Sequence, residues 1–196
     1  MDATSEEQDR SDMARLAAGH DAALNELMGR HAERLFHYLL RVLQNETEAA
    51  DLAEETFVRV YQNRMRFKPE NKFSTWLYTI ATNLARDLQR HRARHPHLSL
   101  EAGHSGAGHD FRETLPDPTP NPGESLETAE RARVVQSAVA ALPEDLRTPL
   151  VLAVYEERSH AEIGEILECS AKAVEMRLYR ARQELRGRLG KVLGPA

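Results

Sequence analysis

The chain has 196 residues, of which 41% are hydrophobic and 29% charged, a balance typical of globular proteins that provides one ordinary domain or two small ones. Aromatic residues make up only 6%, which disfavours a large β-sandwich or barrel, and no apolar run approaches the roughly 20 residues of a membrane-spanning helix. The single cysteine, Cys169, excludes an internal disulfide and a multi-cysteine zinc site, and the acidic N-terminus is unlike a secretory signal, so we expect a cytoplasmic protein without membrane insertion.

The net charge of −5 conceals a strong segregation of charge along the chain. Residues 59–94 hold nine basic and two acidic residues, and residues 172–191 hold seven basic and two acidic residues. Residues 46–55, in contrast, hold five acidic residues and no basic one. Two basic patches and one acidic patch indicate several different partners, and the basic patches suit nucleic acid.

The first half of the chain has a helical pattern throughout. A short helix over about 12–18 is expected to end near Gly19. An apolar stripe over about 24–43 predicts one long helix or two abutting ones, ended by Asn45. The next helix is expected over about 46–65 and carries the acidic residues in its first turns. Acidic residues at a helix start are stabilised by the helix dipole, but five of them also suit a basic partner surface.

The segment around Pro69 combines aromatic and basic residues just before a helix over about 75–93, for which Ser74 is the expected N-cap. Aromatic rings between basic residues suit single-stranded nucleic acid, because unpaired bases stack on rings. One side of the helix then carries a polar row at spacings of four, three and four residues. The candidate residues are Phe67, Lys68, Lys72, Trp76, Thr79, Asn83, Arg86 and Arg90. The alternative is that the aromatic residues belong to the core and the basic ones are simply solvated.

Residues 94–125 lose the helical pattern and contain five prolines and four glycines, with five acidic residues and one basic residue in 96–125. This composition predicts a flexible acidic linker between one domain over 1–93 and another over 126–196. Histidines gather around the linker at spacings that fit no rigid metal site, and we expect them to be solvated. They are His91, His95, His97, His104 and His109. No metal site, cofactor or catalytic residue is expected.

Helices are expected again over about 126–141, 143–156, 159–167 and 171–189, and the last two form a helix-turn-helix. Ser170 is expected to cap the second of these helices, whose buried stripe is Val174, Leu178, Ala181 and Leu185. Its other faces are largely basic and suit entry into a DNA major groove. The candidate DNA contacts are Ser170, Lys172, Glu175, Met176, Arg177, Tyr179, Arg180 and Arg182. The alternative is an ordinary helical hairpin. The fold class is therefore all-α, with two small helical domains on a tether.

The order of these motifs is more specific than any one of them. Residues 49–61 read AADLAEETFVRVY, residues 67–87 read FKPENKFSTWLYTIATNLARD, and residues 141–147 read ALPEDLR before a helix-turn-helix whose residues 177–182 are RLYRAR. Over about residues 12–189 the chain resembles the extracytoplasmic-function (ECF) sigma factors of the sigma-70 family. The resemblance implies a non-enzymatic sigma factor, in which one domain corresponds to sigma region 2 and the other to sigma region 4.

The resemblance implies a role for each segment. The acidic helix would dock on the clamp helices of the largest subunit of core RNA polymerase through Asp51, Glu54, Glu55, Phe57 and Tyr61. The segment 67–90 would open and read the −10 promoter element as a single strand. The helix-turn-helix would read the −35 element as duplex DNA beside the polymerase flap. An anti-sigma protein is a further expected partner.

Three other functions remain as alternatives at this point. A sigma-like decoy would bind an anti-sigma protein without touching DNA. A simple helix-turn-helix repressor would leave the first half unexplained, and an enzyme would need a metal site at the linker histidines. The recognition helix also carries Ala173, Glu175 and Met176 where relatives have a threonine, a base and a serine, so the sequence does not predict which −35 element or regulon is selected.

Overall fold

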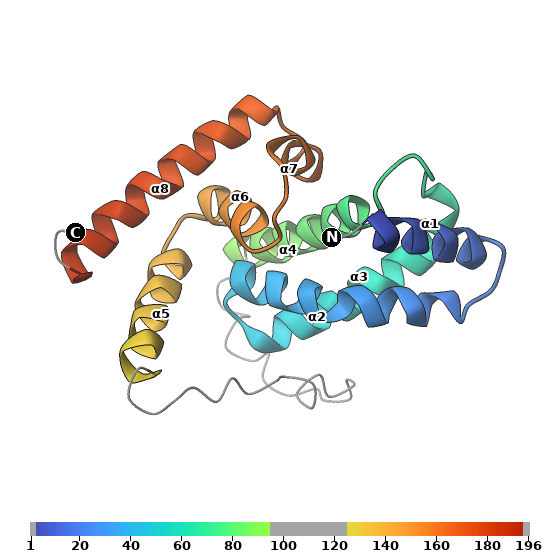
Figure 1. The fold of residues 1–196 in the computed structure, drawn as a ribbon, viewed down its shortest axis with the longest axis horizontal. Coiled ribbons are helices and arrows are strands. Elements are labelled where there is room, and N and C mark those ends of the chain that lie inside the picture. The colour runs from blue at the N-terminus through green and yellow to red at the C-terminus, as the bar shows by residue number, and fades with distance from the viewer. Residues whose placement is uncertain (1–2, 95–124, 194–196) are drawn as a thin grey trace.

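The structure is a computed structural model that describes residues 3–94 and 125–193. Within these ranges the chain forms helices and no strand, which confirms the all-α fold class (Figure 1). Residues 95–124 of the expected linker, which include His95, His97, His104 and His109, lie outside the described residues.

The helices occur in two groups along the chain. The first group is α1 (Ala3–Ala17), α2 (Ala23–Leu43), α3 (Glu46–Gln62), the short 3-10 helix η1 (Arg64–Arg66) and α4 (Phe73–Arg94). The second group is α5 (Ser125–Ala140), α6 (Glu144–Val154), α7 (His160–Leu167) and α8 (Ala171–Leu193). We call the first group the N-terminal half and the second group the C-terminal half.

The apolar stripe of α2 forms the centre of the N-terminal half, where α2 packs on α1, α3 and α4. Its residues Leu27, Leu35 and Leu39 are fully buried, as the three- and four-residue spacing predicted. Helix α3 contributes Phe57 and Val60 to the same core. The stripe forms one continuous helix rather than two.

Helix α1 is longer than the sequence pattern indicated, because ion pairs rather than apolar residues hold its first turns. Asp9 accepts from the Arg30 guanidinium at 2.9 Å and lies 2.8 Å from the His31 ring nitrogen. Arg10 donates to the carbonyl of Pro69 at 2.8 Å. Helix α1 therefore joins α2 to the loop that precedes α4.

Two helix ends differ from expectation. Gln44, not Asn45, ends α2 in a left-handed conformation with φ of 58°, and the Asn45 side chain instead caps α3 by accepting from the Glu48 amide at 3.1 Å. Helix α4 starts at Phe73, one residue before the expected cap. Ser74 is therefore not the N-cap but a buried residue inside the helix.

The C-terminal half contains the expected helix-turn-helix. Ser159 and Glu162 form a capping box at the start of α7, and the Ser170 hydroxyl caps α8 by accepting from the Ala173 amide at 3.1 Å. Val174 and Leu178 are buried, as predicted for the inner stripe of α8.

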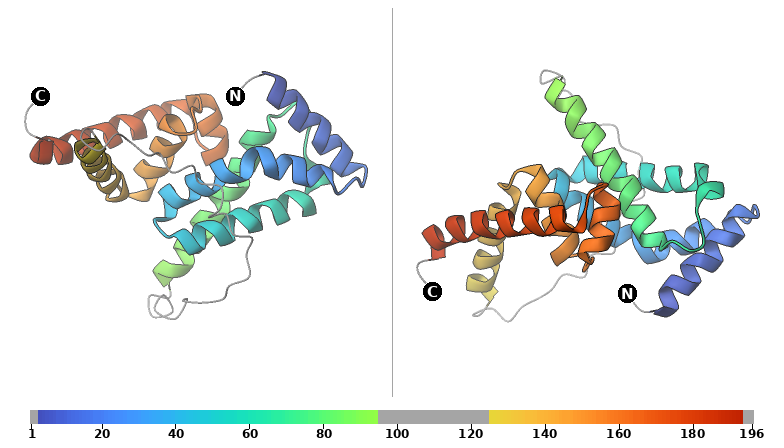
Figure 2. Two further views of the ribbon diagram at one scale, coloured as in Figure 1. Left: turned by 60° about the horizontal axis from the view of Figure 1, so that its bottom comes forward. Right: turned by 90° about the horizontal axis from the view of Figure 1, so that it is seen from above.

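The two halves pack directly against each other, an arrangement that the sequence pattern did not predict. Helix α4 packs on α7, and α2 packs on α6, so that buried residues of both halves join one continuous core. Two further views show α7 against α4 and the C-terminal part of α8 pointing away from the N-terminal half (Figure 2). The described residues of the two helical domains thus share one continuous core.

Gly164 in α7 allows the close turn of the helix-turn-helix and provides a test of its packing. A Cβ atom at Gly164 would lie 2.7 Å from the carbonyl oxygen of Cys169, whereas a Cβ atom at Gly29 of α2 would meet nothing within 4 Å. We expect Gly164→Ala to lower the free energy of unfolding by roughly 1–3 kcal/mol, because backbone must shift. Gly29→Ala should raise it by about 0.5–1 kcal/mol, because alanine favours the helix. Thermal unfolding followed by circular dichroism compares the two, and equal stabilities would contradict the close packing.

Candidate nucleic-acid and polymerase interface

The acidic residues of α3 do not form one uniform surface. Glu55 pairs with Arg59 at 2.6 Å, and Glu48 pairs with Arg92 at the end of α4. Asp51 and Glu54 are exposed, and among the described residues neither forms an ion pair. The free negative charge of α3 is therefore concentrated at these two positions.

The two aromatic residues expected to help in docking lie deeper than the acidic ones. Phe57 is only 3% exposed and belongs to the core. Tyr61 is partly buried, and the Arg64 guanidinium lies 4.3 Å from its ring centre. Phe57 can thus shape the docking helix but is not positioned to contact a partner directly.

Phe67 precedes α4 and Trp76 lies in its first turn, and their ring centres are 5.3 Å apart. Both side chains are partly buried against the core, and Phe73 packs beneath them. Lys68 is exposed next to them. The loop and the first turn of α4 thus combine two partly exposed rings with a positive charge, an arrangement that suits stacking of unpaired bases.

Lys72 is pinned between two carboxylates from different halves of the chain. Its ammonium group lies 3.1 Å from Glu6 of α1 and 3.2 Å from Glu162 of α7. The hydrogen bonds from Lys72 to Glu6 and then to Glu162 raise the pKa of Lys72. In this structure the charge of Lys72 is therefore balanced by carboxylates of the same chain.

The polar row of α4 is divided between solvent and the C-terminal half. Asn83 and Arg90 are exposed, Thr79 is partly buried, and its hydroxyl donates to the carbonyl of Thr75. Arg86 is partly buried and lines a cavity of about 290 Å³ together with Arg90.

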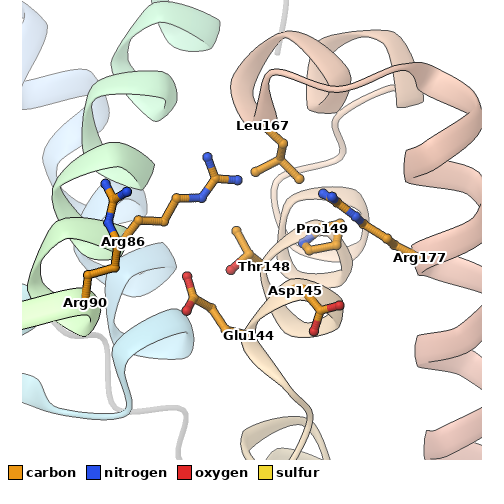
Figure 3. Close-up of a pocket in the computed structure, with 8 residues that line it drawn as sticks. All are labelled: Arg86, Arg90, Glu144, Asp145, Thr148, Pro149, Leu167 and Arg177. Carbon is orange, nitrogen blue, oxygen red and sulfur yellow. The ribbon is translucent and has the colours of Figure 1, made fainter. Parts of the chain in front are cut away.

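That cavity brings together arginines from the two surfaces that the sequence assigns to DNA (Figure 3). Arg86 reaches from α4 toward α7, and Arg177 reaches from α8 toward α6. Glu144 of α6 lies on the α4 side of the cavity, below Arg86 in this view. Burial raises the pKa of Glu144, although Arg86 and Arg147 oppose the shift.

The outer face of α8 carries most of the remaining candidate contacts. Met176 and Tyr179 are unusually exposed, at 44% and 58% of their surface, and the basic residues Arg180 and Arg182 are exposed beside them. Lys172 donates to Glu175 at 2.8 Å, and this hydrogen bond and charge lower the pKa of Glu175. Exposed Met and Tyr on a basic helix form a surface suited to a groove with apolar base edges.

The sequence reasoning missed a polar contact between the halves. The Tyr78 hydroxyl of α4 donates to the Glu156 carboxylate, and the Arg34 guanidinium of α2 lies 3.6 Å from the same carboxylate. Arg158 donates to the Ser74 hydroxyl at 2.9 Å and lies over the Tyr78 ring. No sequence signal pointed to these residues, because charged residues between two helices are ordinarily solvated.

The described residues hold no group of three or more His, Cys, Asp or Glu side chains arranged to bind a metal ion. None of the helices within residues 3–94 and 125–193 combines the length and the apolar composition of a membrane span.

Comparisons with known proteins identify both halves. Sequence models of Sigma-70 region 2 and of Sigma-70 region 4 match residues 27–95 and 132–185. The ECF RNA polymerase sigma factor SigW of Bacillus subtilis (strain 168) is 34% identical, over 87% of this chain and 91% of SigW. The RNA polymerase sigma-H factor of Pseudomonas aeruginosa is 29% identical, over 92% of this chain and 93% of that factor.

Solved structures support the same relationship. CnrH, solved in complex with the cytosolic domain of CnrY, matches with a TM-score of 0.67 and 28% identity, over 94% of this chain and 98% of CnrH. The sigma factor RpoE of Bartonella quintana, solved with the anti-sigma factor NepR, has a TM-score of 0.65 over 84% of this chain and 95% of RpoE. Its identity of 19% supports the fold alone.

The Glu162 carboxylate, which caps α7 and pairs with Lys72, should give the fold a measurable acid sensitivity. Burial opposes ionisation of Glu162, but hydrogen bonds from Ser159 and Lys72 lower its pKa from 4.5 to about 2. Because the folded pKa is the lower one, this stabilisation is complete above pH 4.5 and is lost as the pH falls toward 2. We expect Glu162→Gln to lower the free energy of unfolding at pH 7 by roughly 0.5–1 kcal/mol and to flatten its decline below pH 4.5.

The measurement is urea unfolding at a series of pH values. Glu165→Gln changes an exposed carboxylate on the same helix and is the matched control. An acid decline that is as steep in Glu162→Gln as in the unchanged chain would contradict the role of this carboxylate.

Proposed function

The chain belongs to the ECF sigma factors, and from this membership we propose how its residues divide the work of transcription initiation. Members of this family are non-enzymatic subunits that bind core RNA polymerase and direct it to promoter DNA. The proposal assigns polymerase docking to α3, the −10 element to the loop before α4 and to α4 itself, and the −35 element to α8. It also places the protein in the cytoplasm, where its polymerase and promoters are.

The observation that supports docking is the isolation of Asp51 and Glu54 on α3. Both carboxylates are exposed, whereas Glu55 is engaged by Arg59 at 2.6 Å. Two carboxylates without ion-pair partners can bind a basic surface directly, because no internal ion pair has to break first. The docking contact therefore centres on Asp51 and Glu54, with Glu55 and Tyr61 at its edge and Phe57 holding the helix from beneath.

Opening of the −10 element is assigned to the rings and the polar row beside them. Phe67 and Trp76 offer stacking partners for unpaired bases, and Lys68 offers a charge for the phosphates. Asn83 is exposed one turn beyond Thr79 and has both a donor and an acceptor for a base edge. The −10 face is defined here as Phe67, Lys68, Lys72, Trp76, Thr79, Asn83, Arg86 and Arg90.

Recognition of the −35 element is assigned to the outer face of α8. Arg180 and Arg182 supply charge, and the exposed Met176 and Tyr179 supply apolar contact for base edges. Glu175 accepts a hydrogen bond from Lys172 at 2.8 Å, so the negative charge of its carboxylate is balanced within this face. Ser170 contributes through the cap that starts the helix.

We also propose that a protein inhibitor controls this sigma factor. RpoE of Bartonella quintana, which shares the fold, was solved with an anti-sigma factor. A decoy function would use the same inhibitor but would dispense with polymerase, so binding to core polymerase separates the two functions.

Charge reversal at the two isolated carboxylates tests docking. We expect Asp51→Lys with Glu54→Lys to weaken binding to sigma-free core RNA polymerase roughly tenfold or more, because attraction becomes repulsion. Binding is measured by light scattering or native gel. The matched control is Glu26→Lys with Glu33→Lys, two exposed acidic residues of α2, which should bind as the unchanged chain does. Equal loss in both variants would argue against a specific docking site.

Melting of promoter DNA tests the −10 face. We expect Asn83→Ala with Arg86→Ala to leave binding to core polymerase intact and to lower open-complex formation roughly tenfold, because a base-edge contact and a phosphate contact are lost. Permanganate reactivity of thymines is measured on a promoter that the unchanged holoenzyme selects from random DNA. Asn25→Ala, at an exposed position of α2, is the control. Normal reactivity in the double variant would remove these residues from the melting step.

A further inference from the structure

The loop between η1 and α4 contains one tight turn, at residues 68–71, within the segment that we assign to the −10 element. The Asn71 amide donates to the Lys68 carbonyl at 2.9 Å, which closes a β-turn with Pro69 in its second position. All four residues of the turn are exposed. The side chains of Lys68, Glu70 and Asn71 are therefore accessible to a ligand from outside the chain.

The shape of such a turn depends on the peptide plane between its second and third residues. Rotation of this plane converts a type I turn into a type II turn and requires a positive φ at the third residue. Glu70, in the third position, does not have the positive φ that type II requires. The plane carries the Pro69 carbonyl, so a group that holds this carbonyl also holds the shape of the turn.

Arg10 of α1 holds that carbonyl. Its Nε donates to the carbonyl oxygen of Pro69 at 2.8 Å, across 59 positions of the chain. One helical turn earlier in α1, the Glu6 carboxylate lies 3.1 Å from the ammonium group of Lys72, the residue that follows the turn. Because residues four apart lie on the same side of a helix, one side of α1 contacts both the turn and its exit.

The remaining contacts of α1 attach it to the core independently of the turn. Asp9 is 1% exposed and accepts from the Arg30 guanidinium of α2 at 2.9 Å. Met13 and Leu16 are fully buried in the core of the N-terminal half. Loss of the Arg10 contact should therefore release the turn without releasing the helix.

The Arg10 contact adds order to the turn more than stability to the fold. Arg10 is exposed, and a solvent-exposed polar contact of a long charged side chain contributes little to the free energy of unfolding. A turn that is held in one shape, in contrast, loses less conformational freedom when it binds a ligand. The gain is largest for a ligand that is read by hydrogen bonds, because their donors and acceptors must be correctly placed.

We propose that Arg10 is a positioning residue for recognition of the −10 element, which acts by holding the Pro69 carbonyl and thereby the turn 68–71. This inference rests on the proposed assignment of the −10 face. Arg10 does not itself contact DNA. The turn offers the charge of Lys68 and the amide of Asn71, which has both a donor and an acceptor, and their placement determines how strictly the −10 sequence is selected.

The test compares two promoters rather than one. The first is a promoter that the unchanged holoenzyme selects from random DNA, and the second differs from it by one base in the −10 element. The ratio of open-complex formation on the two, measured by permanganate reactivity, gives the discrimination. We expect Arg10→Gln to lower this ratio about threefold or more, because the turn is no longer held in one shape. Arg10→Lys keeps a long donor and should restore most of the ratio.

A matched control separates positioning from a structural role. Arg15→Gln changes another exposed arginine of α1, which pairs with Asp12 of the same helix at 2.9 Å, and should leave the discrimination unchanged. Binding of Arg10→Gln to core polymerase should also be unchanged, and its thermal midpoint should stay within about 2 °C of the unchanged chain. A lower midpoint with equal losses on both promoters would overturn the positioning role.

A double variant of the turn itself, Lys68→Ala with Asn71→Ala, identifies where a failure lies. If the double variant loses open complex or discrimination while Arg10→Gln keeps both, the turn reads DNA without help from Arg10 and the positioning role is overturned. If neither variant changes open-complex formation or discrimination, the fault lies in the assignment of this loop to the −10 element.

Discussion

The burial of one carboxylate, Glu156, governs how the two halves of this sigma factor lie against each other. A carboxylate removed from water must be met by donors, since desolvation costs more than one ordinary hydrogen bond returns. Tyr78 on α4 donates to it, and the Arg34 guanidinium on α2 lies 3.6 Å away as its ion-pair partner. Burial, the charge of Glu156 and the hydrogen bond to it raise the pKa of Tyr78, so the phenol stays protonated and keeps donating. Because the two partners come from different helices, one side chain fixes the end of α6 against both.

Helix α4 can serve two partners because its sides differ in chemistry. Leu77, Ala81 and Ala85 are buried in the core of the N-terminal half, as a helix needs for stable packing. On another side, the partly buried Thr79 donates to the carbonyl of Thr75, four residues earlier in the same helix. A hydroxyl that is satisfied by its own helix needs no outside partner. Asn83 is exposed one turn further along this side, so its amide remains available to a partner outside the chain.

The sequence predicts those features that local periodicity and capping determine, and misses those that depend on contact between distant segments. The spacing of Val174, Leu178 and Ala181 identifies the inner stripe of α8, and Ser170 caps that helix as expected. Ser74 is a good N-cap by residue type, but helix α4 starts one residue earlier. The Ser74 hydroxyl instead accepts a hydrogen bond from Arg158. The first turns of α1 were missed because Asp9 holds them through ion pairs rather than through an apolar stripe.

The same limit applies to the sites. Residue type and spacing identify a basic, aromatic segment before α4, but which of its charges remain available is decided by the other half of the chain. Lys72 is neutralised by Glu6 and Glu162, while Lys68 is exposed. Likewise the net charge of −5 gives no hint that acidic residues of the C-terminal half lie beside basic residues of α4. A net negative charge is compatible with a DNA partner, because the basic residues are concentrated in residues 59–94 and 172–191 rather than spread evenly along the chain.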